Sequence, residues 1–281
     1  MSTSELLKVW AEHNRRFADF NFVYPVISRR ARGLSIGINC TPNGVCSFDC
    51  IYCQICRNSE KKKVKFPNVS EILFELKDLL SIYRKTKLAE HFPGIEEKNR
   101  ILKDIAFSGD GEPTLYPYFA ELCEAVAEVA ANFLPLPSPK LMLITNAAQI
   151  CDGLEHLTEI WGKLDAGTDE FLQFIDNPRK KINIAAIENN LKFIVSKFPL
   201  RIQTMLCEVR GKIPSEAEIE SYMQIVQRIY EANPKNLLSV QLYSAVRQTA
   251  ENSVKPFPKE FLENVKKKMQ EKNSKLTVET F

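Results

Sequence analysis

The sequence lacks a strong excess of charge, a long apolar run and an export signal. Lys and Arg number 38 against 35 Asp and Glu, so the net charge is only +3, too mild for a protein that binds nucleic acid through its overall field. Its longest apolar runs, such as residues 141–144, fall far short of the roughly 20 residues of a membrane-spanning helix. The N-terminus reads Met-Ser-Thr-Ser-Glu, without a basic segment followed by an apolar one. We therefore expect a soluble, cytoplasmic protein with no membrane partner.

Histidine is scarce, whereas cysteine is abundant. The three histidines, His13, His91 and His156, share no spacing and are interpreted as ordinary surface or core residues. There are eight cysteines, and five of them lie within residues 40–56. Because an unexported protein meets a reducing environment, this clustering favours a metal or cofactor site over disulfides.

Apolar periodicity predicts strands that alternate with helices along the 281 residues. Helices are expected around the apolar stripes of residues 69–83, 119–133, 184–194 and 219–229 and after Pro258, with capping boxes formed by Asn68 with Glu71 and by Ser215 with Glu218. Such an alternation implies a parallel sheet with its chemistry at the carboxyl ends of the strands. Six buried strands are expected, at residues 34–39, 104–108, 140–145, 161–164, 201–207 and 238–242.

Six such units suit either an incomplete barrel or a doubly wound sheet, and the pattern alone does not choose between them. We expect three parts: an N-terminal extension at residues 1–33, a core domain at residues 34–250, and a C-terminal helix and tail at residues 251–281 packed on the core. No internal repeat interrupts this organisation.

The first predicted strand is followed by the run Cys46-Ser-Phe-Asp-Cys50-Ile-Tyr-Cys53. Three thiolates at this spacing can hold three irons of a 4Fe-4S cluster and leave the fourth iron open to an external ligand. The other interpretation is a zinc site completed by Cys40 or Cys56. The roles of these two cysteines stay open, since either could bind metal, cover the cluster, act on substrate or simply be buried.

With its spacing and its place after the first strand, the cysteine run resembles the defining motif of the radical S-adenosylmethionine (radical SAM) superfamily. More narrowly, the chain is similar to the branch related to wyosine-type tRNA synthases, which shares residues 48–54, 108–113, 163–168 and 243–247. The resemblance covers roughly residues 34–250. It implies an α/β fold, a partial (β/α)6 TIM-like barrel of the radical SAM type, with a 4Fe-4S cluster and S-adenosyl-L-methionine (SAM) as cofactors.

The resemblance also implies roles for single residues. Cys46, Cys50 and Cys53 would ligate the cluster, and the glycine-glutamate run would bind the methionine ammonium. Polar residues at later strand ends would contact the ribose hydroxyls, the methionine carboxylate and the adenine, and an arginine would hold an anionic group of the substrate. The residues expected to bind the cofactor are Tyr52, Gly111, Glu112, Asn146, Lys163, Asp165, Gln203 and Tyr243, and the substrate residue is Arg247.

The function predicted by the resemblance is reductive cleavage of SAM, which generates a 5'-deoxyadenosyl radical that abstracts hydrogen from an unidentified substrate. The electron would come from a low-potential donor such as flavodoxin or ferredoxin. Substrates in two classes stay open, tRNA and a small metabolite or peptide. The alternative from another class is a noncatalytic zinc or nucleic-acid-binding module, in which the lysines at 61–63 would contact nucleic acid.

Overall fold

The computed structural model describes residue 15 and residues 17–28, 30–55, 64–133, 137–179, 181–245, 249 and 253–281. The chain divides into two compact units, one of residues 1–45, 57–144 and 151–158 and the other of residues 46–56, 145–150 and 159–281. The predicted division at residues 33 and 250 stays a prediction. Among the described helices, none combines the length and the apolar character needed to cross a membrane.

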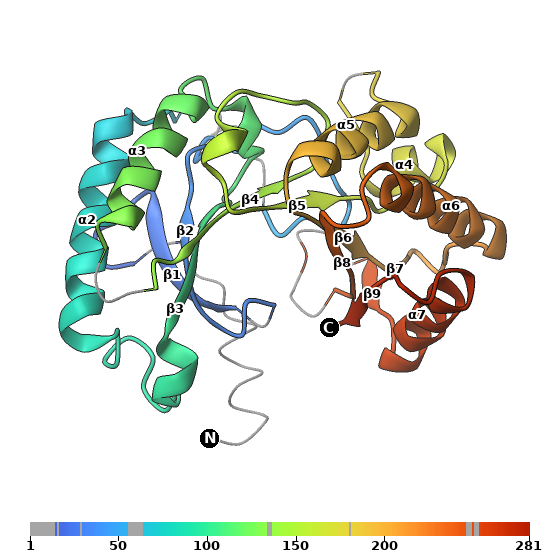
Figure 1. The fold of residues 1–281 in the computed structure, drawn as a ribbon. Helices are drawn as coiled ribbons and strands as arrows, with labels where there is room; N and C mark the ends of the chain where they lie inside the picture. Colours follow the sequence, from blue (N-terminus) through green and yellow to red (C-terminus); the bar gives the residue numbers. More distant parts are fainter. Residues whose placement is uncertain are drawn as a thin grey trace. The chain divides into compact units, whose positions relative to one another are not determined.

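The first unit has four neighbouring strands in chain order, β1 (Val23–Ser28), β2 (Gly33–Ile38), β3 (Leu102–Phe107) and β4 (Lys140–Thr145). Strand β1 pairs antiparallel with β2, and β2, β3 and β4 run parallel. Helices α2 (Val69–Thr86) and α3 (Phe119–Ala131) lie side by side in this unit (Figure 1). The predicted Asn68–Glu71 capping box at the start of α2 is confirmed.

The second unit also has a parallel sheet, of strands β5 (Glu159–Lys163), β6 (Leu200–Met205), β8 (Leu237–Tyr243) and β10 (Val278–Thr280). Two short strands, β7 (Cys207–Val209) and β9 (Val254–Pro256), pair antiparallel beside it. Its helices are α4 (Asp169–Ile175), α5 (Ile184–Lys197), α6 (Glu216–Ala232) and α7 (Lys259–Lys272). The C-terminal segment is therefore more than a helix and tail, because its last strand joins the sheet.

The two faces of this second sheet differ in polarity. Side chains at even positions are mostly apolar and face the helices: a Cβ on Gly162 would come within 2.4 Å of the Leu191 Cδ2 of α5. Thr204 on the same face shares a 2.6 Å hydrogen bond with Tyr222 of α6. Odd positions of β5, β6 and β8 carry polar residues such as Lys163 and point to the opposite face. The chemistry expected at the strand ends thus lies away from α5 and α6.

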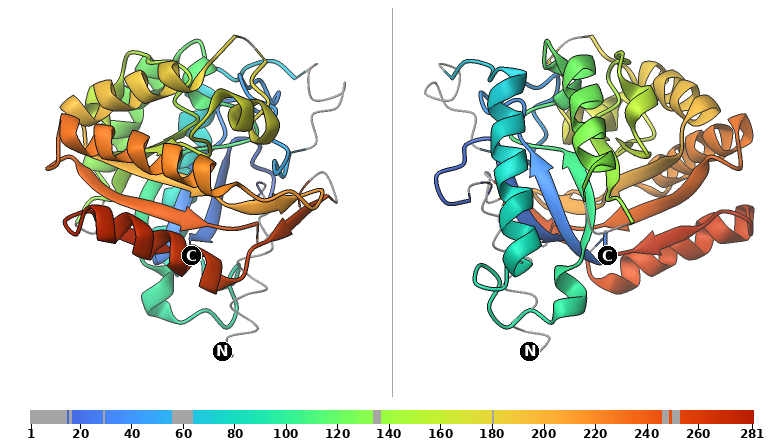
Figure 2. Two further views of the ribbon diagram at one scale, coloured as in Figure 1. Left: turned by 90° about the vertical axis from the view of Figure 1, so that its right-hand side faces the viewer. Right: turned by 60° about the vertical axis from the view of Figure 1, so that its left-hand side comes forward.

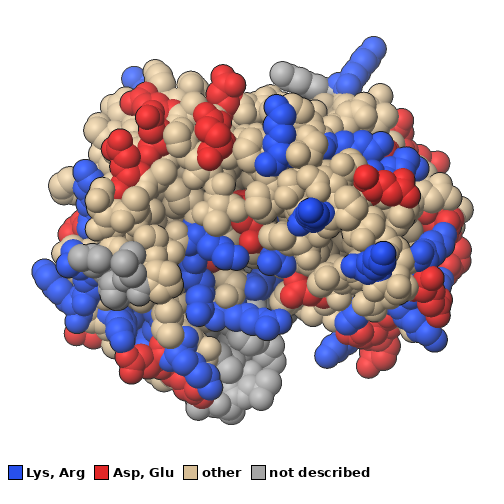
Figure 3. All heavy atoms as spheres, viewed as in Figure 1, with Lys and Arg blue, Asp and Glu red and all other residues tan. Residues whose placement is uncertain are grey.

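Helix α7 lies along β8 and β10 (Figure 2). On the surface over α6 and α7, basic and acidic side chains lie side by side (Figure 3), and Lys268 pairs with Glu216 while Lys272 pairs with Glu220. Because both signs are interspersed, this surface presents no large single-sign field.

One local prediction at the start of α6 is half wrong. The Ser215 hydroxyl accepts a 3.1 Å hydrogen bond from the Glu218 N–H, as expected of a capping residue. The Glu218 carboxylate, however, accepts hydrogen bonds from the Gly167 N–H and, at 2.6 Å, from the Thr168 hydroxyl. It therefore holds the turn after β5 instead of closing a capping box.

Candidate functional site

The cysteine loop, residues 46–53, is fixed to the end of α4 by its backbone. The N–H groups of Asp49 and Ile51 each donate a 3.0 Å hydrogen bond, to the carbonyls of Asp176 and Ile175. Helix-terminal carbonyls lack intrahelical partners, so the loop satisfies them while α4 gives the loop a defined shape. The Arg179 N–H adds a 2.8 Å bond to the Ser47 carbonyl.

Tyr52, the aromatic residue before the last cysteine of the motif, connects the loop to strand β5. Its hydroxyl lies at hydrogen-bond distance from a carboxylate oxygen of Asp165 and 3.0 Å from Oδ1 of Asp176. The other Asp165 oxygen accepts a 2.6 Å bond from the Met205 N–H at the end of β6. These contacts bring three elements of the second unit together around one buried carboxylate.

Lys163 lies beside that carboxylate, between two tyrosine rings. Its Nζ is 3.2 Å from Asp165 and donates a 2.9 Å hydrogen bond to the Tyr243 hydroxyl. It also lies 4.7 Å from the centroid of the Tyr52 ring and 5.6 Å from that of Tyr243, so both rings stabilise its charge. Four of the predicted cofactor residues are thus in direct contact: Tyr52, Lys163, Asp165 and Tyr243.

Burial and charge shift the proton affinities in this cluster. Burial, reinforced by the neighbouring carboxylate of Asp165, raises the pKa of Tyr52 and raises that of Asp176 to about 7. Burial also raises the pKa of the Cys50 thiol, with Asp176 adding to the effect. For Lys163, burial opposes the charged form, but Asp165 and the other acidic groups around it together outweigh burial, and the pKa lies above its usual range.

Two further predicted residues lie in the same unit. The Asn146 amide donates a 2.8 Å hydrogen bond to the Ser47 hydroxyl and lies 3.7 Å from the Cys46 sulfur. Gln203 is the register partner of Lys163 on the neighbouring strand and is 1% exposed, with its amide directed to Gln241 at 3.1 Å. Asn146 therefore contacts the cysteine loop, whereas Gln203 belongs to a row of amides across the sheet.

The glycine-glutamate run lies in the first unit, where its glycines are sterically required. A Cβ on Gly109 would come within 2.2 Å of Asn39 Oδ1, and one on Gly111 within 2.1 Å of the Val45 carbonyl oxygen. The Glu112 carboxylate is buried and accepts a 2.9 Å hydrogen bond from the Thr114 hydroxyl. The predicted contacts of Gly111 and Glu112 with the methionine ammonium stay predictions.

The first unit also contains an unsatisfied polar atom next to this run. The Thr41 hydroxyl is buried and has no hydrogen-bond partner within the described part of the chain. A Cβ on Gly111 would lie 2.9 Å from it. A buried hydroxyl without a partner is unfavourable in the bare chain, so this position suits a polar ligand group.

Comparison with known proteins supplies further evidence. No family model matches the chain. The chain is 28% identical over 250 residues to a Brachyspira hyodysenteriae protein named GTPase Obg, a match that covers 86% of this chain and 32% of that protein. It is 27% identical over 194 residues to a UPF0026 protein of Synechocystis, covering 67% and 66% of the two. The chain thus spans about a third of the first relative and 66% of the second.

The solved structures that resemble it include the following three. A structure of TYW1 with a lysine-pyruvate adduct bound has a TM-score of 0.59 and 21% identity, covering 86% of this chain and 74% of that one. A radical SAM methyltransferase from Sphaerobacter thermophilus has a TM-score of 0.60 and 12% identity, covering 92% and 68%. Streptococcus suis SuiB bound to S-adenosylmethionine has a TM-score of 0.56 and 15% identity, covering 85% and 49%.

The chain has the fold of radical SAM enzymes. The resemblance predicted from the cysteine run is therefore confirmed at the level of the fold, and so is the α/β partial barrel. The roles of single residues depend on the chemistry of the site.

The cysteine loop fits the iron-sulfur cluster that this fold implies. All three motif cysteine residues are partly exposed. The Phe48 N–H donates a 3.5 Å hydrogen bond to the Cys46 sulfur, the kind of contact that tunes a thiolate ligand. Within the described residues no three His, Cys, Asp or Glu side chains gather around a point that one metal ion could fill. A cubane cluster needs no such convergence, because each thiolate binds a different iron.

The remaining cysteines divide by burial. Cys40, Cys123 and Cys207 are buried, and burial raises the pKa of each thiol, to about 12 for Cys207. Cys151 is partly exposed, and its pKa is raised to about 12, again mainly by burial. Predictions that lie outside the described residues are those for Cys56, Arg247 and the lysines at 61–63.

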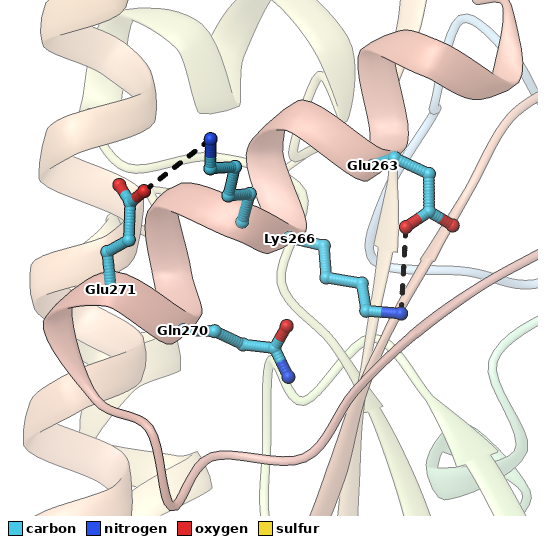
Figure 4. A pocket seen from close by; sticks show the side chains of 5 residues that line it. Glu263, Lys266, Gln270 and Glu271 are labelled. Atoms are coloured by element: carbon cyan, nitrogen blue, oxygen red, sulfur yellow. Dashed lines mark ion pairs between the residues drawn. The ribbon is translucent and has the colours of Figure 1, made fainter.

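A surface pocket on α7 is lined by charged and polar side chains, unlike the buried cluster around Lys163 (Figure 4). Its side chains all come from one helix and largely pair with one another, Lys266 with Glu263 at 3.6 Å and Lys267 with Glu271 at 3.9 Å. Exposed ion pairs of this kind contribute little energy, and no buried polar group completes a binding site there.

The sequence did not predict the roles that three residues of the second unit have in the structure. Asp176 and Glu218 hold the cysteine loop and the turn after β5, and Glu279 bonds to the polar side chains of β6 and β8. No local pattern identifies Asp176. The capping-box spacing did draw attention to Glu218, and the alternating residues 276–280 could have suggested a final strand that carries Glu279.

Proposed function

We propose that this chain is a radical SAM enzyme that binds a 4Fe-4S cluster through Cys46, Cys50 and Cys53. The observation that carries the proposal is the hydrogen bond from Tyr52 to Asp165, because it joins the cysteine loop to the end of β5, where we expect SAM to bind. When bound, the cluster and SAM supply reductive cleavage of the sulfonium, giving a 5'-deoxyadenosyl radical that abstracts hydrogen from the substrate.

The chain's own residues hold and shield this chemistry. The contacts of Tyr52 with Asp165 and Asp176 keep the loop in one conformation. Lys163 stays protonated between two rings and places a fixed positive charge beside the loop, suited to a carboxylate ligand. Asn146, next to Ser47, offers an amide for a ribose hydroxyl. We assign delivery of the electron to a flavodoxin or ferredoxin.

The experiment is anaerobic reconstitution with iron and sulfide. About four irons and four sulfides per chain are expected, and dithionite with SAM is expected to release 5'-deoxyadenosine. Cys50→Ala is expected to lose both the cluster and the product. Cys123→Ala is the matched control, since Cys123 is a buried thiol on α3 in the other unit.

A result with one zinc per chain and no SAM binding would instead support the noncatalytic metal-binding module. Retention of 5'-deoxyadenosine release by Cys50→Ala would contradict the cysteine assignment.

The substrate class has its own test. A tRNA substrate predicts that the chain binds tRNA with an affinity that falls steeply as the salt concentration rises. Replacement of the lysines at 61–63 should then abolish that binding. Absence of such binding would direct the search to small metabolites and peptides.

A further inference from the structure

A row of polar side chains crosses the second sheet from β6 to β10. Gln203 donates a 3.1 Å hydrogen bond from Nε2 to Oε1 of Gln241, and Gln241 donates one of 3.3 Å from Nε2 to Glu279. The three residues are register partners on adjacent strands. Both glutamines are 1% exposed, so neither can exchange these partners freely for water.

Glu279 is an acceptor for three donors at one carboxylate oxygen. Besides Gln241, the Ser239 hydroxyl donates at 2.9 Å and the Arg201 guanidinium at 3.3 Å. Arg201 is also bonded at 2.5 Å to Glu159, so it is held by carboxylates on both sides. A carboxylate can only accept hydrogen bonds.

The Glu279 carboxylate determines how the amide groups of Gln241 and Gln203 are oriented. Because Glu279 cannot donate, Gln241 must turn its NH2 group toward it and its carbonyl oxygen toward Gln203. Gln203 must then turn its own NH2 group toward Gln241. The carbonyl oxygen of Gln203 is therefore turned away from Gln241 and is left as a hydrogen-bond acceptor for a ligand.

Gln203 lies on the strand next to the one that carries Lys163. It is the register partner of Lys163, whose ammonium lies over the ring of Tyr52 in the cysteine loop. Its side chain is on the polar face of the sheet, opposite α5 and α6.

We propose that Glu279 and Gln241 are positioning residues that fix Gln203 as an acceptor for a hydrogen-bond donor on the nucleoside part of SAM. Two donors of SAM share this chemistry, the 6-amino group of adenine and a ribose hydroxyl. The inference rests on the proposed function. It adds that Gln203 accepts a hydrogen bond from SAM and that the C-terminal strand β10, through Glu279, fixes the orientation of the Gln203 amide.

The test measures Kd by equilibrium dialysis with the cluster-loaded protein and four ligands. These are SAM, its analogue with oxygen in place of the 6-amino group, and its 2'-deoxy and 3'-deoxy analogues. The wild-type protein is expected to prefer SAM about tenfold over the analogue that lacks the donor facing Gln203. The analogue that shows this loss identifies which donor it is.

Three variants examine the row. Glu279→Met removes the acceptor, so both amides can turn and the preference is expected to fall to within about twofold. Gln241→Met breaks the row but leaves Arg201 paired with Glu279, and the same fall is expected even if the first variant folds poorly. Glu279→Gln keeps a carbonyl oxygen for Arg201, Ser239 and Gln241, so the wild-type preference is expected to persist.

The ratio of the Kd of an analogue to the Kd of SAM separates a positioning role from a structural one. A merely structural role would weaken the binding of all four ligands alike, so the ratio would not change. Equal affinity of the wild-type protein for all four ligands would overturn the acceptor role of Gln203. Wild-type ratios in both methionine variants would overturn the positioning role. Failure of the wild-type protein to bind SAM at all would count against the proposed function, and this inference would fall with it.

Discussion

At the scale of single residues, the carboxylate of Glu75 on α2 binds the backbone of the segment before β1. It accepts hydrogen bonds from three successive backbone N–H groups, those of Asn21 at 2.8 Å, Phe22 at 2.7 Å and Val23 at 3.0 Å. Glu75 is 7% exposed, so its charge is compensated by these donors and not by water. The side chain therefore attaches the segment leading into β1 to α2.

Replacing Glu75 tests this attachment. Glu75→Ala is expected to lower the free energy of unfolding by about 3 kcal/mol, because three N–H groups lose their acceptor together. Urea denaturation at pH 7 measures the change. Asp78→Asn, at an exposed position of the same helix, is the control and is expected to change stability by no more than about 0.5 kcal/mol. Equal effects of the two substitutions would show that the backbone contacts of Glu75 are not important.

Single residues also show what the sequence could and could not predict. The motif cysteines, Lys163 and Asp165 were found because their spacing or their position at a strand end is a local signal. Asp176 and Glu75 carry no such signal, since each acts by meeting a backbone or side chain far away in the sequence. Pattern reasoning detects periodicity, and these contacts exist only once the chain has folded.

At the scale of elements, helices α5 and α6 are joined by a bidentate ion pair. Arg228 donates two hydrogen bonds to Glu188, at 2.8 and 2.7 Å, and Lys192 lies 2.6 Å from the same carboxylate. The Arg228 hydrogen bonds, with those of Lys192, outweigh burial and lower the pKa of Glu188 to about 2. A carboxyl group whose pKa is lower in the folded state stabilises the fold above its unfolded pKa.

The lowered pKa of Glu188 determines how the stability of the fold depends on pH. The contribution of Glu188 is fully present at pH 7 and is lost as the pH falls from about 4.5 through about 2. Glu188→Gln is expected to cost about 1 kcal/mol at pH 7, less than the shift alone implies because Arg228 is half-exposed and screened by solvent. The difference from wild type should shrink toward zero near pH 2. Urea titrations at several pH values measure it, and a difference independent of pH would contradict the ion pair.

Most elements were predicted, but their ends and the shortest ones were not. The six predicted strands all exist, and the helix after residue 184 ends before Pro199 as expected. The predicted strand at 201–207 is instead β6, which ends at Met205, and a separate β7, which pairs with β9 and not with β8. Strand β1 and the three-residue strands β9 and β10 were missed, since a proline in the first and the shortness of the other two hide the alternation.

At the scale of the whole molecule, fold and site follow from different kinds of information. Alternation of apolar residues along strands and helices is enough to specify a parallel α/β architecture, and structures with 12–21% identity share it. The polar contacts of the second unit depend on which strands become neighbours. Glu279 reaches Gln241 only because the last strand pairs with β8.

The effect of SAM on the stability of the intact protein tests the proposed function. SAM at about 100 times its Kd is expected to raise the free energy of unfolding of the cluster-loaded protein by about 2.7 kcal/mol, because it binds only the folded state. For a chain of this length the melting temperature should rise by about 5 °C, measured by scanning calorimetry under anaerobic conditions. Cys50→Ala should show no rise, because without the cluster SAM has no open iron to bind. A rise of equal size in that variant would mean that SAM stabilises the fold without the cluster, contrary to the proposed site.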